Sequence, residues 1–237
     1  MRLDKLLSNY KYGTRTAVKK LIKSGKVTVN NAVVKDNAMH INPEIDCVTI
    51  AGEVLNYKKQ IVFMMNKPKG VVSTRKDPYY KSVFDLLSQS DQRFDLSIAG
   101  RLDVDTEGLL LLTNDGALLH EIITPNKMVE KVYYVETKQV IDNIEALLKP
   151  MTLLDGNDTP YTPRKPKIIT SDKNTAVIAI CEGKYHQVKR MFAAINHEVV
   201  YLKRIAINKL TLDENLALGA YKILSEDEIQ ALINKEG

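Results

Sequence analysis

Cysteine is scarce in this sequence, and long apolar runs are absent from it. Cys47 and Cys181 are the only cysteines among 237 residues, which excludes a disulfide framework and a cysteine zinc site. No run approaches the roughly 18 apolar residues that span a bilayer, and the opening MRLDKLLSNYKYG lacks an apolar signal core. We therefore expect a cytoplasmic protein with no membrane partner.

The usual metal and cofactor motifs are also missing. The four histidines lie apart and form no HExxH or comparable ligand pair, so their spacing predicts no metal site. Neither GxGxxG nor the P-loop pattern GxxxxGK(S/T) occurs, and no serine or cysteine nucleophile elbow is present. Any chemistry is therefore expected to depend on a carboxylate with basic and aromatic helpers, and on no cofactor.

The excess of positive charge is confined to the N-terminal quarter. Residues 1–60 carry eleven Lys and Arg against five Asp and Glu, whereas the rest of the chain carries twenty-three against twenty-four. A basic module joined to a nearly neutral body is typical of proteins that bind a polyanion. Lys58-Lys59-Gln60 precedes a new apolar strand, so we predict one domain over 1–58 and a second over 59–237.

Hydrophobic spacing predicts two helices and short strands in the basic module. The first helix, over residues 2–10, has leucines on one face. The second begins with Thr14 as N-cap and ends at Gly25, which suits a left-handed cap. Alternating valines then predict short strands around an Asn30-Asn31 turn and a further strand over 46–50.

The segment 100–116, GRLDVDTEGLLLLTNDG, places an arginine and an aspartate at a turn before an uncharged apolar run. The buried run over 109–112 is a rigid support that can hold a polar side chain at its mouth in fixed geometry. Asp103 is therefore the leading candidate for a catalytic carboxylate. The segment also begins like a calcium loop, but its twelfth position is Asn114 instead of glutamate, which disfavours calcium. A structural turn without chemistry is the other alternative.

The body of the chain is expected to be rich in strands. Alternation and buried runs predict strands over 61–65, 131–135 and 176–180, and helical segments over 82–87 and 118–123. The loop over 73–81 interleaves basic residues with tyrosines, which suits nucleic acid but is also found in ordinary exposed loops.

A late helix is predicted to begin within a residue or two of His186. Its apolar positions include Val188, Met191, Phe192 and Ile195, which we expect to be buried. Basic side chains on the first turns of this packed helix would be held in place more firmly than on a mobile loop.

Four ordered motifs, NKPKGVVST, GRLDVDTEGLLLLTNDG, EKVYYV and EGKYHQVKRMF, resemble the RsuA-type family of ribosomal RNA pseudouridine synthases. The resemblance spans essentially the whole chain, and the basic module is similar to the alpha-L fold of the S4 RNA-binding domain. It implies an α+β protein in which this small domain precedes a catalytic domain with a bent, mainly antiparallel mixed sheet flanked by helices. It also implies a monomer that isomerises uridine to pseudouridine in RNA without metal or cofactor.

The resemblance also implies roles for particular residues. Asp103 would be the catalytic aspartate that attacks the flipped uridine or its ribose, and Tyr133 the tyrosine that packs on the target base. Lys189 would pair with the aspartate, with Arg190 as the alternative if the register differs by one. Arg101 would fill or brace the gap left in the RNA. Phosphate contacts are expected from Lys67, Arg204, Arg2, Lys5, Arg15, Lys19, Lys20 and Lys23.

Two substrates and one different class of protein are consistent with these motifs. The segments DPYYKSVFDLL and LALGAYKILSEDEI resemble those of the small-subunit members of this family, and this resemblance implies small-subunit (16S) ribosomal RNA as substrate, naked or in an assembling particle. Large-subunit (23S) ribosomal RNA is the runner-up, because large-subunit relatives share the core motifs. The different class is a ribosome-assembly RNA-binding protein that keeps the fold without the chemistry. Such a protein would lose the aspartate, the tyrosine or the basic partner, and all three are present here.

Overall fold

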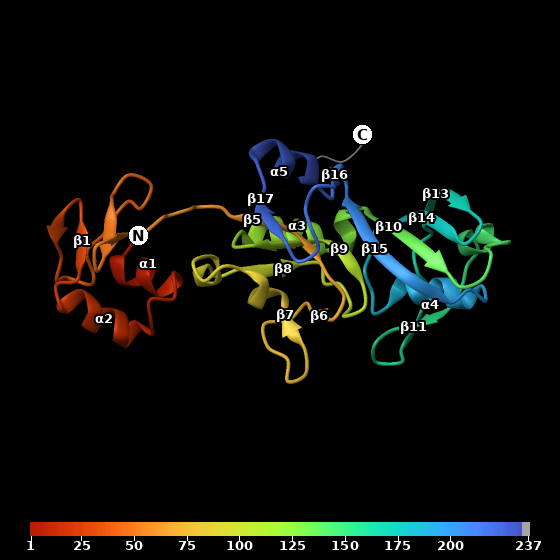
Figure 1. The fold of residues 1–237 in the computed structure, drawn as a ribbon, viewed down its shortest axis with the longest axis horizontal. Coiled ribbons are helices and arrows are strands. Elements are labelled where there is room, and N and C mark those ends of the chain that lie inside the picture. Colours follow the sequence, from red (N-terminus) through yellow and green to blue (C-terminus); the bar gives the residue numbers. More distant parts are fainter. Residues whose placement is uncertain (234–237) are drawn as a thin grey trace. The chain divides into compact units, whose positions relative to one another are not determined.

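The structure is a computed structural model that describes residues 1–233. The chain forms two compact units, each with its own secondary structure (Figure 1). The first unit comprises residues 1–61 together with 87–96, and the second comprises 62–86 with the chain from residue 97 onward. The sequence analysis assigned residues 87–96 to the second domain, whereas in the structure they group with the first.

The basic module combines two helices with a four-stranded antiparallel sheet. The helices are α1 (Leu3–Asn9) and α2 (Arg15–Lys23), and the strand order is β2 (Ala32–Val33), β1 (Val27–Val29), β3 (Val48–Ile50), β4 (Glu53–Val54). The Thr14 hydroxyl accepts a hydrogen bond from the Ala17 N–H at 3.3 Å, which confirms the predicted N-cap. Gly25 has φ 79°, and Asn30 and Asn31 have φ 50° and 66°, so the predicted left-handed cap and turn are confirmed.

One apolar core joins the two helices to this sheet. Leu3, Leu6 and Leu7 of α1 cluster with Val18 and Ile22 of α2 and with the strand valines. This packing leaves four cationic side chains of α2 exposed: Arg15, Lys19, Lys20 and Lys23.

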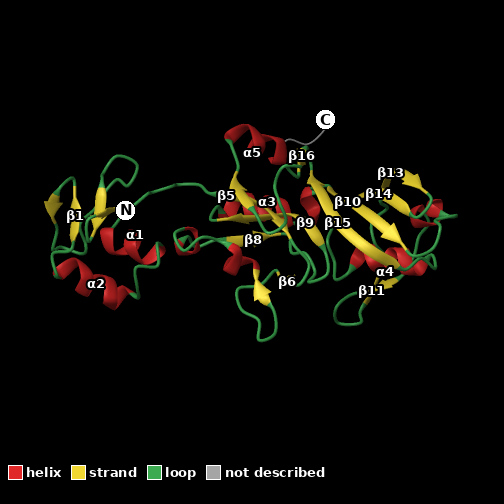
Figure 2. Cartoon of the chain, in the orientation of Figure 1, coloured by secondary structure: helices red, strands yellow, loops and turns green. Residues whose placement is uncertain are grey.

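The second unit is built on a nine-stranded mixed sheet, drawn in yellow in Figure 2. Its path runs β13, β14, β10, β15, β9, β5, β17, while β16 pairs with β15 and β8 with β9. The strands are β5 (Val62–Lys67), β8 (Ser97–Ala99), β9 (Glu107–Thr113), β10 (Lys131–Thr137), β13 (Lys167–Asp172), β14 (Thr175–Ile180), β15 (Val199–Ile207), β16 (Leu210–Thr211) and β17 (Tyr221–Ile223). The pairs β6 (Val71–Val72) with β7 (Lys81–Ser82) and β11 (Leu153–Leu154) with β12 (Pro160–Tyr161) lie outside it.

Strands β9 and β15 form the one parallel pair of this sheet as far as residue 233, and Gly108 lies opposite Arg204 in it. A Cβ at Gly108 would stand 2.2 Å from the carbonyl oxygen of Arg204, and its φ of +103° is one that other residues rarely adopt. Glycine is therefore required for the two strands to approach. The apolar run over 109–112 is fully buried, as predicted, and the remaining antiparallel pairs confirm the expected fold class.

Three helices accompany this sheet: α3 (Gly116–Ile123), α4 (Gln187–Ala194) and α5 (Glu226–Ile233). Single 3-10 turns span Val83–Leu86, Asp91–Arg93, Pro125–Lys127 and Ile144–Leu148. The helical segment expected over 82–87 is thus only the first of these turns. Ile195, expected to be buried, is half-buried because α4 ends one residue before it.

Among residues 1–233, no helix has both the length and the apolar character that crossing a bilayer requires.

Candidate active site

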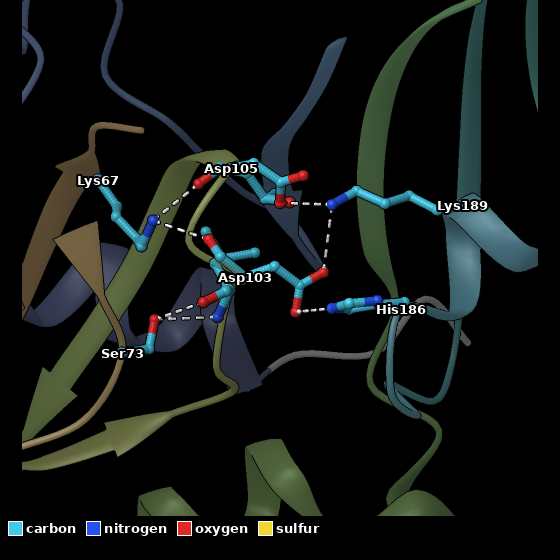
Figure 3. A network of polar contacts seen from close by, with 8 residues as sticks. Lys67, Ser73, Asp103, Asp105, His186 and Lys189 are labelled. Atoms are coloured by element: carbon cyan, nitrogen blue, oxygen red, sulfur yellow. Dashed lines mark hydrogen bonds and ion pairs between the residues drawn. The ribbon is translucent and has the colours of Figure 1, made fainter. Parts of the chain in front are cut away.

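Asp103 lies in the loop between β8 and β9, and two side chains from neighbouring segments hold this loop. The Ser73 hydroxyl donates to the Leu102 carbonyl at 2.7 Å and accepts from the Leu102 N–H at 3.1 Å. Ser73 is 4% exposed, so this clamp is shielded from water. The backbone next to Asp103 is therefore fixed before any substrate binds (Figure 3).

The ammonium group of Lys67, at the end of β5, holds the other side of the same loop. It donates to the carbonyl oxygens of Asp103 and Thr106, both at 2.9 Å, and of Pro68 at 3.0 Å. Lys67 is 0% exposed, and burial lowers its pKa to about 8 although nearby carboxylates oppose that shift. The predicted phosphate contact is corrected here, because a buried cation that is used by three carbonyls offers no surface to RNA.

Two side chains from the region of α4 face the Asp103 carboxylate, one at each oxygen (Figure 3). Lys189 Nζ lies 3.6 Å from Oδ2, and His186 Nε2 lies 3.6 Å from Oδ1. Lys189 also makes a shorter contact, 2.5 Å, with Asp105 Oδ1. Burial disfavours the charged form of Asp105, but the hydrogen bond and charge of Lys189 outweigh this and lower its pKa. Lys189 is thus shared between two carboxylates.

A cavity of about 290 Å³ opens beside the Asp103 carboxylate. Tyr133 of β10, which is 7% exposed, and the exposed Arg101 contribute to its wall. Apolar walls come from Leu102, Ile180, Val188 and Leu202. The site therefore joins an anchored carboxylate, an aromatic ring and two kinds of basic group around a space of small-ligand size.

The residues around this cavity that come from Arg101 to Val188 lie within a segment that matches a known protein family. Residues 61–194 match the family described as RNA pseudouridylate synthase, and residues 1–44 match the S4 domain. The chain belongs to the RNA pseudouridylate synthase family. It is accordingly an enzyme that converts uridine in RNA to pseudouridine, and both the predicted family and the predicted S4 domain are confirmed.

Full-length relatives support the same assignment to the pseudouridylate synthases. An uncharacterized RNA pseudouridine synthase of Bacillus subtilis is 45% identical, with 98% of each chain covered. Ribosomal small subunit pseudouridine synthase A is 38% identical in Vibrio cholerae and 36% in Escherichia coli, covering 98% of this chain and 99% and 100% of theirs. A crystal structure of a pseudouridylate synthase superimposes with a TM-score of 0.67 at 36% identity, covering 98% and 99%.

Arg190 lies apart from the aspartate of this synthase. Its Nη1 donates to the carbonyl oxygens of Leu154 and Asp155, and its guanidinium lies 5.0 Å from the centre of the Tyr185 ring. The geometry therefore selects Lys189, and not the register alternative Arg190, as the cation that faces Asp103. Arg190 is half-buried and joins α4 to the loop after β11.

Arg204 was also expected to contact phosphate, and the structure places it beneath the surface. It is 1% exposed and donates to the carbonyl oxygens of Leu109 at 2.8 Å and Gly100 at 2.7 Å. Its Nη1 also lies 3.5 Å from the Tyr133 hydroxyl. Arg204 thus ties β15 to β9 and to the loop between β8 and β9, beneath the surface.

The basic residues of the S4 domain divide into two groups. Arg2, Lys5, Arg15 and Lys19 line one concavity of about 330 Å³ together with Asp4. The guanidinium of Arg2 is paired with Asp4 at 2.7 Å. Lys20 and Lys23 are exposed but do not line that concavity. Four of the six predicted phosphate contacts of this domain therefore share one concavity.

His186 is the residue at this site whose contact the sequence did not reveal. The spacing of the histidines predicted only that His186 is no metal ligand. It stands just before α4 in a left-handed conformation, φ 51°, which directs its ring toward Asp103 (Figure 3). The available signal in the sequence was its place directly before a helix whose first turn carries Lys189.

Proposed function

We propose that this synthase isomerises a uridine of small-subunit (16S) ribosomal RNA, with Asp103 as its nucleophile. The observation that carries the proposal is the anchored Asp103 carboxylate, which shares a cavity with Tyr133 and faces Lys189 at 3.6 Å. A carboxylate must lie close to the nucleotide to act as a nucleophile.

A uridine inside an RNA helix cannot reach this carboxylate, so the target nucleotide has to leave the stack. The cavity beside Asp103 would receive the flipped base, which would pack on Tyr133. Arg101, exposed at the cavity wall, would occupy the gap in the RNA. The bond from ribose C1′ to N1 of the base breaks, a bond from C1′ to C5 forms, and a proton leaves C5 while N1 gains one. Attack at C1′, attack at C6 and a glycal path all use the same carboxylate.

The choice of small-subunit RNA rests on the relatives. Two proteins named ribosomal small subunit pseudouridine synthase A are 36% and 38% identical to this chain over almost their whole lengths. The S4 domain supplies a basic concavity that would hold ribosomal RNA through its phosphates. We also propose that the enzyme is cytoplasmic, as the sequence predicts, and monomeric, as the family resemblance implies.

The decisive experiment offers the purified protein three substrates: unmodified 16S transcript, unmodified 23S transcript and partly assembled small subunits. Pseudouridine is then mapped by chemical modification and primer extension. Asp103→Asn serves as the variant, with Asp158→Asn, an exposed carboxylate outside the cavity lining, as its matched control. We expect one new 16S site that the control retains and that Asp103→Asn makes at least about 10³-fold more slowly.

The other outcomes separate the alternatives. A new site in 23S RNA would keep the mechanism and overturn the substrate. Tight binding without any new site, together with cell phenotypes that Asp103→Asn leaves unchanged, would instead identify an assembly factor. A normal rate in Asp103→Asn would remove the nucleophile assignment.

A further inference from the structure

A second cavity, of about 390 Å³, adjoins the one that holds Asp103. The two share Arg101, Tyr133, Gly183 and Lys184 in their walls, so Tyr133 stands between them. The proposed reaction at Asp103 makes no use of this second space. Its contents therefore need a separate explanation.

Two buried cations, Lys131 of β10 and Arg204 of β15, line this second cavity. Lys131 is 6% exposed and Arg204 is 1% exposed. Along β10 the side chains alternate in burial, which puts Lys131 on the same face of the sheet as Tyr133. The cavity thus has a cationic floor directly beside the ring that the target base would contact.

Neither of these cations has an anionic partner within residues 1–233. Lys131 Nζ donates to the Val129 carbonyl at 3.0 Å, and Arg204 donates to two carbonyls and approaches the Tyr133 hydroxyl. The one acidic residue among those that line this cavity, Glu182, is occupied elsewhere, since its Oε1 accepts from the Arg164 N–H and from Gln187 Nε2. The floor therefore carries two buried positive charges that only neutral groups solvate.

Such a pair is costly in the free protein. Burial, with a smaller contribution from the charge of Arg204, lowers the pKa of Lys131 to about 8. A buried charge without a counter-ion is unfavourable, and an anion that enters the cavity would relieve both the desolvation and the mutual repulsion. The apolar side of the cavity, formed by Ile98, Ile123 and Pro125, suits the sugar that accompanies a phosphate in a nucleic acid chain.

We propose that the second cavity binds one backbone phosphate of the RNA, next to the nucleotide whose base occupies the Asp103 cavity. This inference rests on the proposed function. It assigns to Lys131 a role in holding the flipped nucleotide that is separate from the chemistry at Asp103. Lys131 is thus a binding residue for a single phosphate, whereas the S4 domain contacts the RNA elsewhere.

A double-mutant cycle between protein and RNA tests this assignment. Synthetic RNAs that contain the mapped uridine carry one uncharged methylphosphonate at each flanking position in turn. Dissociation constants and the kcat and KM of pseudouridine formation are measured for the wild type, Lys131→Met and Lys149→Met, an exposed lysine as matched control. We expect one methylphosphonate position to weaken wild-type and Lys149→Met binding about tenfold and to leave Lys131→Met binding unchanged.

The proposal would be overturned if the methylphosphonate at every position weakened RNA binding equally in the wild type and in Lys131→Met. Lys131→Met replaces a buried cation with an apolar side chain of similar length, so we expect it to fold, with a melting temperature at or above that of the wild type. Lys131→Arg keeps the charge, so the methylphosphonate that weakens wild-type binding should weaken its binding as well. If that methylphosphonate has no effect on Lys131→Arg or on Lys131→Met, the result would count against a phosphate contact.

Two further measurements distinguish the phosphate assignment from the proposed function and from the binding of free phosphate. If no RNA acquires pseudouridine, the proposed function fails, whereas normal pseudouridine formation without a Lys131-dependent position removes the phosphate assignment alone. Inhibition of pseudouridine formation by inorganic phosphate is also compared with inhibition by chloride at equal ionic strength. Lys131-dependent inhibition by phosphate without a sensitive RNA position would assign the cavity to free phosphate and overturn the RNA contact.

Discussion

The imidazole of His186 faces the carboxylate of Asp103, with Nε2 at 3.6 Å from Oδ1. Its ring stacks on Tyr185 with centroids 3.8 Å apart, and Tyr185 in turn lies 5.0 Å from the guanidinium of Arg190. Since Lys189 faces the other carboxylate oxygen, the rotation of the Asp103 side chain is limited from both sides. His186 is therefore placed to orient Asp103, the proposed nucleophile.

Replacing His186 by glutamine is expected to lower kcat roughly 10-fold to 100-fold and to change KM less than about threefold. Small displacements of a reacting group reduce rates by such factors while substrate binding elsewhere is retained. His120→Gln, at an exposed position of α3, is the matched control. Single-turnover pseudouridine formation on saturating RNA measures the effect. Equal rates in the two variants would show that the contact with Asp103 has no role.

Lys189 is shared between two carboxylates, and this predicts unequal effects of their substitutions. Lys189→Met leaves Asp103 and Asp105 close together without their common cation, so we expect a loss in kcat of about 100-fold. Asp105→Asn removes only the competitor for Lys189, and kcat should change less than about fivefold. The rates of pseudouridine formation by both variants, measured at one pH under single-turnover conditions, test this expectation. A larger loss in Asp105→Asn would mean that Asp105, rather than Asp103, depends on the cation.

Gly108 is predicted to be the least replaceable glycine of the second unit. Gly108→Ala sets a Cβ 2.2 Å from the Arg204 carbonyl oxygen at φ +103°, so we expect the free energy of unfolding to fall by about 2–4 kcal/mol. Gly116→Ala is the control, because a Cβ there meets no atom within 4 Å and Gly116 starts a helix. Urea denaturation measures both. Equal stabilities would contradict the close approach of β9 and β15.

Local patterns in the sequence were sufficient for much of this site. The apolar run over 109–112 and the turn before it located Asp103, and alternation predicted the strand that carries Tyr133. Whether a lysine is solvated or buried is decided by distant parts of the chain. Lys67 and Arg204 resembled surface cations in sequence, but the loop before β9 supplies carbonyl oxygens that both of them bind.

The contact of His186 could not be predicted for a related reason. It depends on the left-handed conformation of His186 itself, φ 51°, at a position where no glycine or asparagine makes such a conformation predictable. The parallel pairing of β9 with β15 joins segments almost a hundred residues apart, and only Gly108 hints at it. Long-range register of this kind leaves little trace in local periodicity.

The basic concavity of the S4 domain predicts that the lysines of its two helices differ in importance. Lys5→Glu with Lys19→Glu should weaken RNA binding at least about tenfold more than Lys20→Glu with Lys23→Glu, although the charge change is equal. Only the first pair lines the concavity. Affinity measured across a salt series should show a shallower slope for the first pair alone, with the rate on bound RNA unchanged. Equal losses would indicate a diffuse electrostatic surface.

The pH dependence of stability gives a test of the buried lysines that needs no RNA. Burial lowers the pKa of Lys131 to about 8 from an ordinary 10.5, so between these values the unfolded chain holds more protons than the native one. Stability therefore rises with pH across this window, by about 2 kcal/mol between pH 7 and pH 9.5 for one such lysine. Raised pKa values of Tyr161 and Tyr201 act in the opposite direction at high pH, but they are common to wild type and variant. The raised pKa of Cys181 acts in that direction too, and the charge of Lys131 partly offsets it, so its loss in the variant makes the difference shrink further.

The informative quantity is thus the difference in unfolding free energy between Lys131→Met and the wild type. This difference should favour the variant most at pH 7 and shrink by about 2 kcal/mol at pH 9.5, as measured by urea denaturation. Lys149→Met, at an exposed position, provides the comparison. A difference that stays constant with pH would mean that Lys131 carries no buried charge, and the argument for an anion in the second cavity would lose its electrostatic basis.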